Sequence, residues 1–169
     1  MRSALCTLRG GGVLALAALL VVQLSGCAMP AREKPGALRS DVLARLGPPT
    51  ASFPLSSGER LLYSELPAGF AAYTLDFDAA GRLVRNEQVL TQSRFESIPV
   101  DLWTAVNVQR TFGAPLRVER VARFDGDIWT YRFRQNSDPR LAHVHLDREG
   151  VVRRVMFTDE LPNFDNTRD

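Results

Sequence analysis

Hydrophobic and polar residues alternate with a period of two along much of the second half of the chain, which predicts antiparallel strands at 116–124, 129–134, 142–146 and 151–157. In the second of these stretches, Trp129, Tyr131 and Phe133 share one face of the strand. In the third, Ala142, Val144 and Leu146 form the inward row. The apolar rows predict a sheet with one face packed against a core.

Turn signals separate these strands. Asp125-Gly126 is typical of a two-residue hairpin, because a type I′ turn requires positive φ at both central positions. A loop follows at 136–139, and residues 147–150 form a four-residue turn in which Gly150 adopts the left-handed conformation. The strands are therefore expected to follow one another as hairpins.

A helix is expected before these strands. Pro99 and Asp101 indicate its start, and Gly113 with Pro115 indicates its end. Its apolar side, which we expect to face the core, consists of Leu102, Trp103, Val106 and Phe112.

The same order of features occurs earlier in the chain. Three pairs of segments align in the same order, namely 45–49 with 111–115, 61–63 with 129–131, and 77–81 with 146–150. In the first copy the helix is predicted at Arg39–Leu46, and Tyr73, Leu75 and Phe77 form the inward row of a strand. The chain is therefore predicted to contain two copies of one helix-plus-sheet unit.

The predicted fold class is α+β, with two tandem helix-plus-antiparallel-sheet units. The expected division is a signal peptide at 1–26, a tether at 27–36, a first repeat at 37–90, a linker at 91–99, a second repeat at 100–158 and an acidic tail at 159–169. A unit of about 55 residues buries too little surface to be stable by itself. We therefore expect the two units to pack on each other.

The N-terminus has the features of a secretory signal peptide. Arg2 and Arg9 form a positive region, and the apolar run from Val13 to Leu24 is shorter than the ~20 residues that a spanning helix needs. The run ends in Leu-Ser-Gly-Cys at 24–27, which resembles the lipobox of bacterial lipoproteins. The resemblance implies cleavage before Cys27 and lipid attachment to that residue, and Ala28 after the cysteine implies sorting to the outer membrane. Two or more acyl chains give stable anchoring.

The repeated motifs resemble those of a known family. A helix ending in Leu-Gly-x-Pro, a Leu/Trp-x-Tyr strand and a Phe/Leu-Asp-x-x-Gly turn, at the segments aligned above, resemble the SmpA/OmlA (BamE-like) family of outer-membrane lipoproteins. The doubled unit is similar to the fold of β-lactamase inhibitory proteins. The chain departs from the family in having two units, and in carrying Leu61 where the family often has Trp. The resemblance implies that the chain binds protein partners.

Charge and cysteine content narrow the possible functions. Of the 21 basic and 19 acidic residues, Arg2 and Arg9 lie in the expected signal peptide, so the mature chain carries 19 of each. This balance does not favour nucleic-acid binding. Cys6 also lies in the signal peptide, so after its removal Cys27 has no second thiol for a disulfide or a cysteine-based metal site.

Few residues suggest catalysis. His143 and His145 share one face of a strand with Asp147 and are the candidate metal ligands, but that face is opposite the inward row. We therefore favour a solvated strand face for the histidines, with no metal, cofactor or small-molecule substrate. The acidic pairs at 76/78 and 125/127 flank predicted turns, where aspartate caps backbone amides. No recognisable nucleophile, zinc or phosphate motif occurs, so we do not expect an enzyme.

The second unit is the more basic one. Between 104 and 158 there are ten arginines and six acidic residues. An arginine stripe could meet an acidic partner or an anionic headgroup, but we favour a solvated face with intramolecular pairing to the acidic tail. The candidate stripe comprises Arg110, Arg117, Arg120, Arg123, Arg132, Arg134, Arg153 and Arg154.

The expected function is that of a lipid-anchored, periplasm-facing outer-membrane lipoprotein that assists envelope assembly by binding a protein. Its contact surface is expected at the exposed sheet face and the loops at 56–59 and 125–127. The alternative is an inhibitor or sensor of a periplasmic enzyme that uses the concave surface between the repeats.

Overall fold

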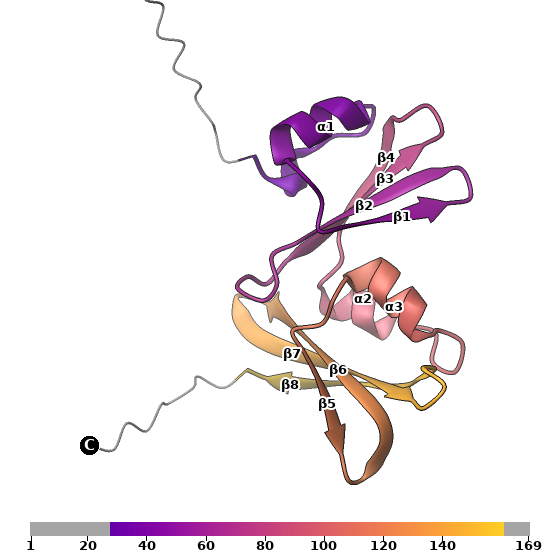
Figure 1. Cartoon of the computed structure of the whole chain (residues 1–169). Helices are drawn as coiled ribbons and strands as arrows, with labels where there is room; N and C mark the ends of the chain where they lie inside the picture. The colour runs from indigo at the N-terminus through magenta and orange to yellow at the C-terminus, as the bar shows by residue number, and fades with distance from the viewer. Residues whose placement is uncertain (1–27, 161–169) are drawn as a thin grey trace, which may run out of the picture.

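Each half of the described chain contains an eight-residue α-helix followed by four antiparallel strands in sequential order, and the second half begins with an additional short helix (Figure 1). The computed structural model describes residues 28–160. The first half contains η1 (Pro30–Arg32), α1 (Arg39–Leu46), β1 (Ala51–Leu55), β2 (Gly58–Ser64), β3 (Ala72–Asp78) and β4 (Leu83–Gln88). The second half contains α2 (Gln92–Glu96), α3 (Ala105–Phe112), β5 (Arg117–Val121), β6 (Phe124–Gln135), β7 (Asp138–Asp147) and β8 (Val152–Asp159).

The two halves share details as well as element order. Helices α1 and α3 each have eight residues, and each ends at a glycine with positive φ, Gly47 at 76° and Gly113 at 83°. A tyrosine from the second strand of each sheet donates a hydrogen bond to that glycine's carbonyl. Tyr63 bonds Gly47 at 3.0 Å, and Tyr131 bonds Gly113 at 2.9 Å. The predicted helix at Arg39–Leu46 is confirmed, as is the repeated order of the elements.

The Asp-x-x-Gly turns also correspond. In each turn the aspartate side chain accepts a backbone amide, from Arg82 to Asp78 and from Val151 to Asp147, both at 2.8 Å. The turn glycine has φ of 70° in the first copy and 76° at Gly150, as expected for this position. The first amide of each helix then donates to the carbonyl of this glycine, at 2.9 Å in the first unit and 2.8 Å in the second. This turn therefore positions the helix against its own sheet.

A small core lies between α1 and the first sheet. Val42 of α1 packs against four fully or almost fully buried sheet residues, Leu61, Leu75, Phe77 and Leu83. The predicted inward row at 73, 75 and 77 contacts this cluster.

A second, larger core is shared by both units. Leu62 and Ala72 of the first sheet belong to the same buried cluster as Phe95 of α2, Phe112 of α3 and Tyr131 of the second sheet. Figure 1 shows α2 and α3 between the two sheets. The layers are therefore α1, first sheet, α2 with α3, and second sheet, and the expectation that the units pack on each other is confirmed.

Polar contacts also join the units. The guanidinium of Arg110 in α3 donates to the carbonyl of Pro54 in β1. Arg132 and Arg134 of β6 lie over the ring of Phe70, with centroid distances of 5.0 and 4.3 Å. The loop between β2 and β3 is therefore held against the second sheet.

The predicted start of the second helix is wrong. The helix begins at Ala105, and Asp101 has a positive φ of 66° in the preceding turn. The amide and the hydroxyl of Thr104 both donate to the side-chain oxygen of Asn107, at 2.9 Å each. These hydrogen bonds cap the N-terminus of α3 at Thr104. The signals at Pro99 and Asp101 had placed that N-terminus too early in the chain.

The predicted apolar side of this helix is therefore only partly correct. Phe112 is fully buried, and Trp103 packs against the shared core. Leu102 and Val106, however, are 77% and 61% exposed, and Val108 occupies the inward position instead. Leu102 precedes the helix, so helical spacing does not apply to it.

The segments expected to be linker, tether and tail take part in the fold. The expected linker, 91–99, contains α2, whose Phe95 is fully buried. In the expected tether, the carbonyls of Pro30 and Glu33 accept hydrogen bonds from the Asn86 side chain, at 2.7 and 2.9 Å. In the expected tail, Glu160 pairs with Arg132. Residues 161–169 lie outside the described part of the chain.

The predicted hairpin at Asp125-Gly126 is also wrong. The turn between β5 and β6 lies at 122–123, and the ladder of β5 and β6 shifts register beyond Glu119. Positive φ at two successive non-glycine positions occurs at Asn136 and Ser137, with 50° and 78°, where a longer loop was expected. Gly126 instead lies within β6, where an added Cβ would meet the carbonyl oxygen of Leu146 at 2.0 Å.

The predicted signal peptide, lipobox and lipidated Cys27 lie outside the described residues. None of the helices within residues 28–160 has the length and apolar composition needed to cross a membrane.

Candidate binding surface

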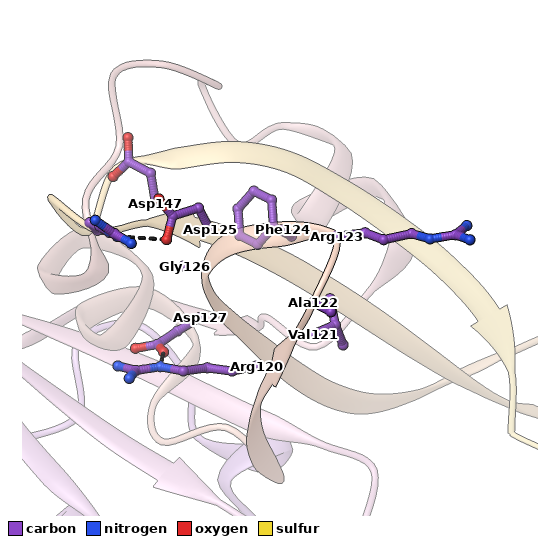
Figure 2. Close-up of a pocket in the computed structure, with 10 residues that line it drawn as sticks. Arg120, Val121, Ala122, Arg123, Phe124, Asp125, Gly126, Asp127 and Asp147 are labelled. Atoms are coloured by element: carbon purple, nitrogen blue, oxygen red, sulfur yellow. Dashed lines mark hydrogen bonds and ion pairs between the residues drawn. The ribbon is translucent and has the colours of Figure 1, made fainter.

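The β5–β6 hairpin surrounds a polar hollow at the end of the second sheet (Figure 2). The hollow has a volume of about 820 Å³. It is lined by the hairpin residues 120–127 together with Asp147 and Arg148 from the β7–β8 turn. The close approach of β6 to β7 at Gly126 brings these two segments together, because a side chain at that position would clash with the backbone of β7.

Ion pairs organise the charges of this hollow. Arg120 donates to Asp127 at 2.6 Å, as a dashed line in Figure 2 shows, and Arg148 donates to Asp125 at 2.5 Å. The pairing with Asp127 raises the pKa of the Arg120 guanidinium above its usual value. The hydrogen bond from the Val151 amide is the main cause that lowers the pKa of Asp147. Arg120 and Asp147 therefore stay charged, which suits recognition of charge rather than transfer of a proton.

Arg123 differs from its neighbours. It lies at the turn, is exposed, and points away from the two ion pairs (Figure 2). No carboxylate among residues 28–160 lies within ion-pair distance of it. Its guanidinium is therefore available to a ligand outside the described chain.

The two histidines share the outer face of the second sheet, but they are less solvated than predicted. His143 lies between two hydroxyls, with Nδ1 3.0 Å from Thr130 and Nε2 2.9 Å from Thr158. His145 is buried and its ring makes an edge contact with Phe124 at a centroid distance of 4.9 Å. Burial is the main cause that lowers the pKa of both imidazoles.

The geometry explains how the ring nitrogens are used. Arg154 lies 3.3 Å from Nδ1 of His145, and because a guanidinium can only donate, this nitrogen is the acceptor. The third member of the candidate row, Asp147, accepts hydrogen bonds from the Val151 amide and from the Arg153 guanidinium. Within residues 28–160 there is no group of three His, Cys, Asp or Glu side chains that could hold a metal ion.

The predicted acidic pairs are separated by their partners. Asp76 binds Arg60 through both carboxylate oxygens, at 2.6 and 2.7 Å. Asp78 accepts the amides of Ala80 and Arg82 in its turn. Asp125 and Asp127 each pair with a different arginine, as described above. The turn-capping interpretation is therefore confirmed for Asp78, whereas the other three form ion pairs.

Most of the candidate arginines have partners within the fold. Arg117 pairs with Glu119 at 2.7 Å, and Arg153 pairs with both Asp101 and Asp147. Only some of this pairing is with the predicted acidic tail, through Glu160. Intramolecular pairing is confirmed, but most of the acceptors lie within the second unit.

The two loops expected to form one contact surface lie apart. The β1–β2 turn and the β5–β6 turn are at different ends of the molecule in Figure 1. Glu59, beside the first turn, is occupied by Arg39 and Ser52, both at 2.5 Å. These two hydrogen bonds lower the pKa of its carboxyl group. Between the two units, where the alternative interpretation places a concave surface, lie α2, α3 and the shared core (Figure 1).

Strand β5 was not recognised as an exposed edge from the sequence. All five of its residues are exposed, because the shared core does not extend beneath it. The signal in the sequence was the pattern Arg-Val-Glu-Arg-Val, in which three of the five residues are charged.

Comparison with known proteins adds little. No family model matches the chain, and no curated protein matches it. A crystal structure of a DUF4309 family protein (YjgB) from Bacillus subtilis subsp. subtilis str. 168 is similar over 73% of this chain and 79% of that chain, with 16% identity and a TM-score of 0.31.

Proposed function

We propose that this chain is a lipid-anchored lipoprotein of the SmpA/OmlA type, located on the periplasmic side of the outer membrane, which binds a protein partner during envelope assembly and does not itself catalyse a reaction. The observation that carries the proposal is the position of the charged hollow. The described fold begins within a few residues of Cys27, since η1 starts at Pro30 and is held against β4 through Asn86. A lipid on Cys27 therefore keeps the first unit near the membrane.

The hollow lies at the opposite end of the molecule. Figure 1 shows the N-terminal end of the described chain beside α1, and the β5–β6 turn at the far side of the second unit. In an anchored molecule this hairpin points away from the lipid, where a periplasmic partner can reach it. Arg123 at its tip supplies a charge with no carboxylate partner in the described chain.

The chemistry of the hollow favours binding over catalysis. Its carboxylates are paired or hydrogen-bonded, and the pKa of Asp147 is lowered, whereas a general acid needs a carboxyl group with a raised pKa. Alternating positive and negative side chains give specificity toward a partner of complementary charge.

The proposal is tested by photo-cross-linking in intact cells. A photoreactive residue at Arg123 is expected to capture an outer-membrane assembly protein, whereas the same residue at Val84, exposed on β4, is the matched control and captures none. Equal capture at both positions, or none at Arg123, contradicts the proposed surface.

The anchor is tested with Cys27→Ala. This change is expected to abolish incorporation of labelled palmitate and to weaken capture of the partner. If a soluble periplasmic enzyme is captured equally with and without the lipid, the chain is an inhibitor or sensor instead, and the anchor serves only as a tether.

A further inference from the structure

Within the described chain, β5 is the one sheet edge whose backbone receives no hydrogen bond from outside its sheet, either from backbone or from side chains. On the β4 edge, the carbonyl of Leu83 accepts a hydrogen bond from the Gly36 amide at 2.7 Å, and its amide donates to the carbonyl of Ala37 at 2.8 Å. On the β8 edge, the carbonyl of Val152 accepts a hydrogen bond from the Asp101 amide, and its amide donates to the carbonyl of Trp103, both at 2.8 Å. The β1 edge contains Pro54, which has no amide hydrogen and whose carbonyl accepts Arg110.

The side chains of β5 have a self-complementary order. Val118 lies between Arg117 and Glu119, which project from the opposite face and are about half exposed. Val118 is itself 52% exposed. If two copies of the strand pair antiparallel about a two-fold axis at Val118, each Arg117 lies opposite Glu119 of the other copy, and the two valines lie opposite each other.

Other registers lack this match. Side chains directly opposite each other lie on one face of the sheet, so the two-fold axis must pass through the same residue of both copies. An axis at Arg117, Glu119 or Arg120 places two like charges opposite each other, and an axis at Val121 would pair the strand with the turn at 122–123. Like charges directly opposite destabilise a strand pair. The charge pattern therefore selects the register centred on Val118.

We propose that β5 is a self-association edge, through which a second copy of this chain pairs antiparallel about Val118 and joins the two second-unit sheets into one continuous sheet. The contact is isologous, so each β5 is used once and association ends at the dimer. This inference goes beyond the proposed partner-binding role and does not depend on it.

The register is tested by disulfide trapping in the full-length chain in cells treated with the oxidant diamide. Val118→Cys is expected to give a disulfide-linked homodimer, because directly opposed Cβ atoms are about 4.5–5.5 Å apart, close to the spacing of a disulfide. Val121→Cys is the matched control, since it lies on the same strand with 46% exposure. In the proposed register the two control positions are six residues out of alignment, about 20 Å apart.

Charge reversal tests the same register independently. In the Val118→Cys background, Arg117→Glu is expected to lower the yield of dimer several-fold, and adding Glu119→Arg is expected to restore it, because both cross-strand pairs re-form with exchanged charges. The double change also keeps an ion pair between positions 117 and 119 of the same strand, with the charges exchanged.

The proposal is overturned if Val118→Cys and Val121→Cys give equal yields, or if neither gives a homodimer. It is also overturned if the double reversal fails to restore cross-linking, or if Val118→Cys is trapped with a different protein. Loss of the Arg123 photo-cross-link with retention of the homodimer would refute only the proposed partner-binding function.

Discussion

Tyr131→Phe and Tyr63→Phe remove equivalent hydroxyl groups from the two units and therefore form a matched pair. Each hydroxyl donates to the carbonyl of the glycine that ends its helix, at 2.9 Å for Gly113 and 3.0 Å for Gly47. The surroundings differ. Tyr131 and Gly113 are buried in the shared core, whereas Tyr63 and Gly47 are both partly accessible.

The accessibility difference sets the expected magnitudes. Burial raises the pKa of Tyr131, so its hydroxyl stays protonated and remains a donor. Tyr131→Phe leaves a buried carbonyl without this donor, which costs about 1–3 kcal/mol. Tyr63→Phe leaves a carbonyl that water can reach, so it costs about 0.5–1 kcal/mol.

Urea unfolding of protein lacking the first 27 residues measures both values. With an m-value of about 2 kcal/mol/M, the midpoint is expected to fall by about 1 M for Tyr131→Phe and by about 0.3 M for Tyr63→Phe. Far-UV circular dichroism reports both sheets, while fluorescence reports the second unit, because both tryptophans lie there. An equal shift for the two variants, or a larger shift for Tyr63→Phe, would refute the reasoning.

Three further outcomes are expected. Gly47→Ala costs about 1–3 kcal/mol in urea unfolding, because its φ of 76° and ψ of −165° suit only glycine, and Gly113→Ala costs more, because its Cβ would also meet a side-chain carbon of the first sheet at 2.6 Å. Asp76→Asn breaks a largely buried bidentate ion pair and lowers the unfolding free energy by about 1–3 kcal/mol, and a smaller loss would contradict the structural role of the pair. The unfolding free energy is expected to fall as pH drops from about 7 to 5, because the pKa values of His143 and His145 are lower in the folded chain than in the unfolded chain, which therefore binds protons at a higher pH. Replacing both histidines by asparagine is expected to remove this dependence of the unfolding free energy on pH.

Local signals in the sequence predicted the features that depend on a few neighbouring residues. The glycines at 47 and 113 ended both helices because the positive φ there requires them, and Gly150 occupied the left-handed position of its turn. The inward row that includes Tyr131 was also correct, because alternation along a strand with one covered face is itself a local pattern.

Features that depend on distant residues were not predictable in this way. The start of α3 is set beside a bridge between Thr104 and Val151, which no local capping signal reveals. Phe95 belongs to the shared core although its flanking residues are polar, so its segment resembled a linker. The β5–β6 turn moved away from Asp125-Gly126 because β6 continues beyond the edge of the core, where pairing with β7 determines its extent.

The two units share a fold but differ in what they leave exposed. The first sheet is covered on both faces, by α1 and by the shared core, so four successive residues of β3, from 74 to 77, are buried. Among residues 28–160, other elements cover only one face of the second sheet, and its outer face is shielded by its own side chains, such as Arg132 and Phe124. The free edge, the hollow and Arg123 consequently all belong to the second unit. The two units thus differ in their surfaces: the unit beside the proposed anchor has both sheet faces occupied, and the distant unit carries the surface that we propose binds a partner.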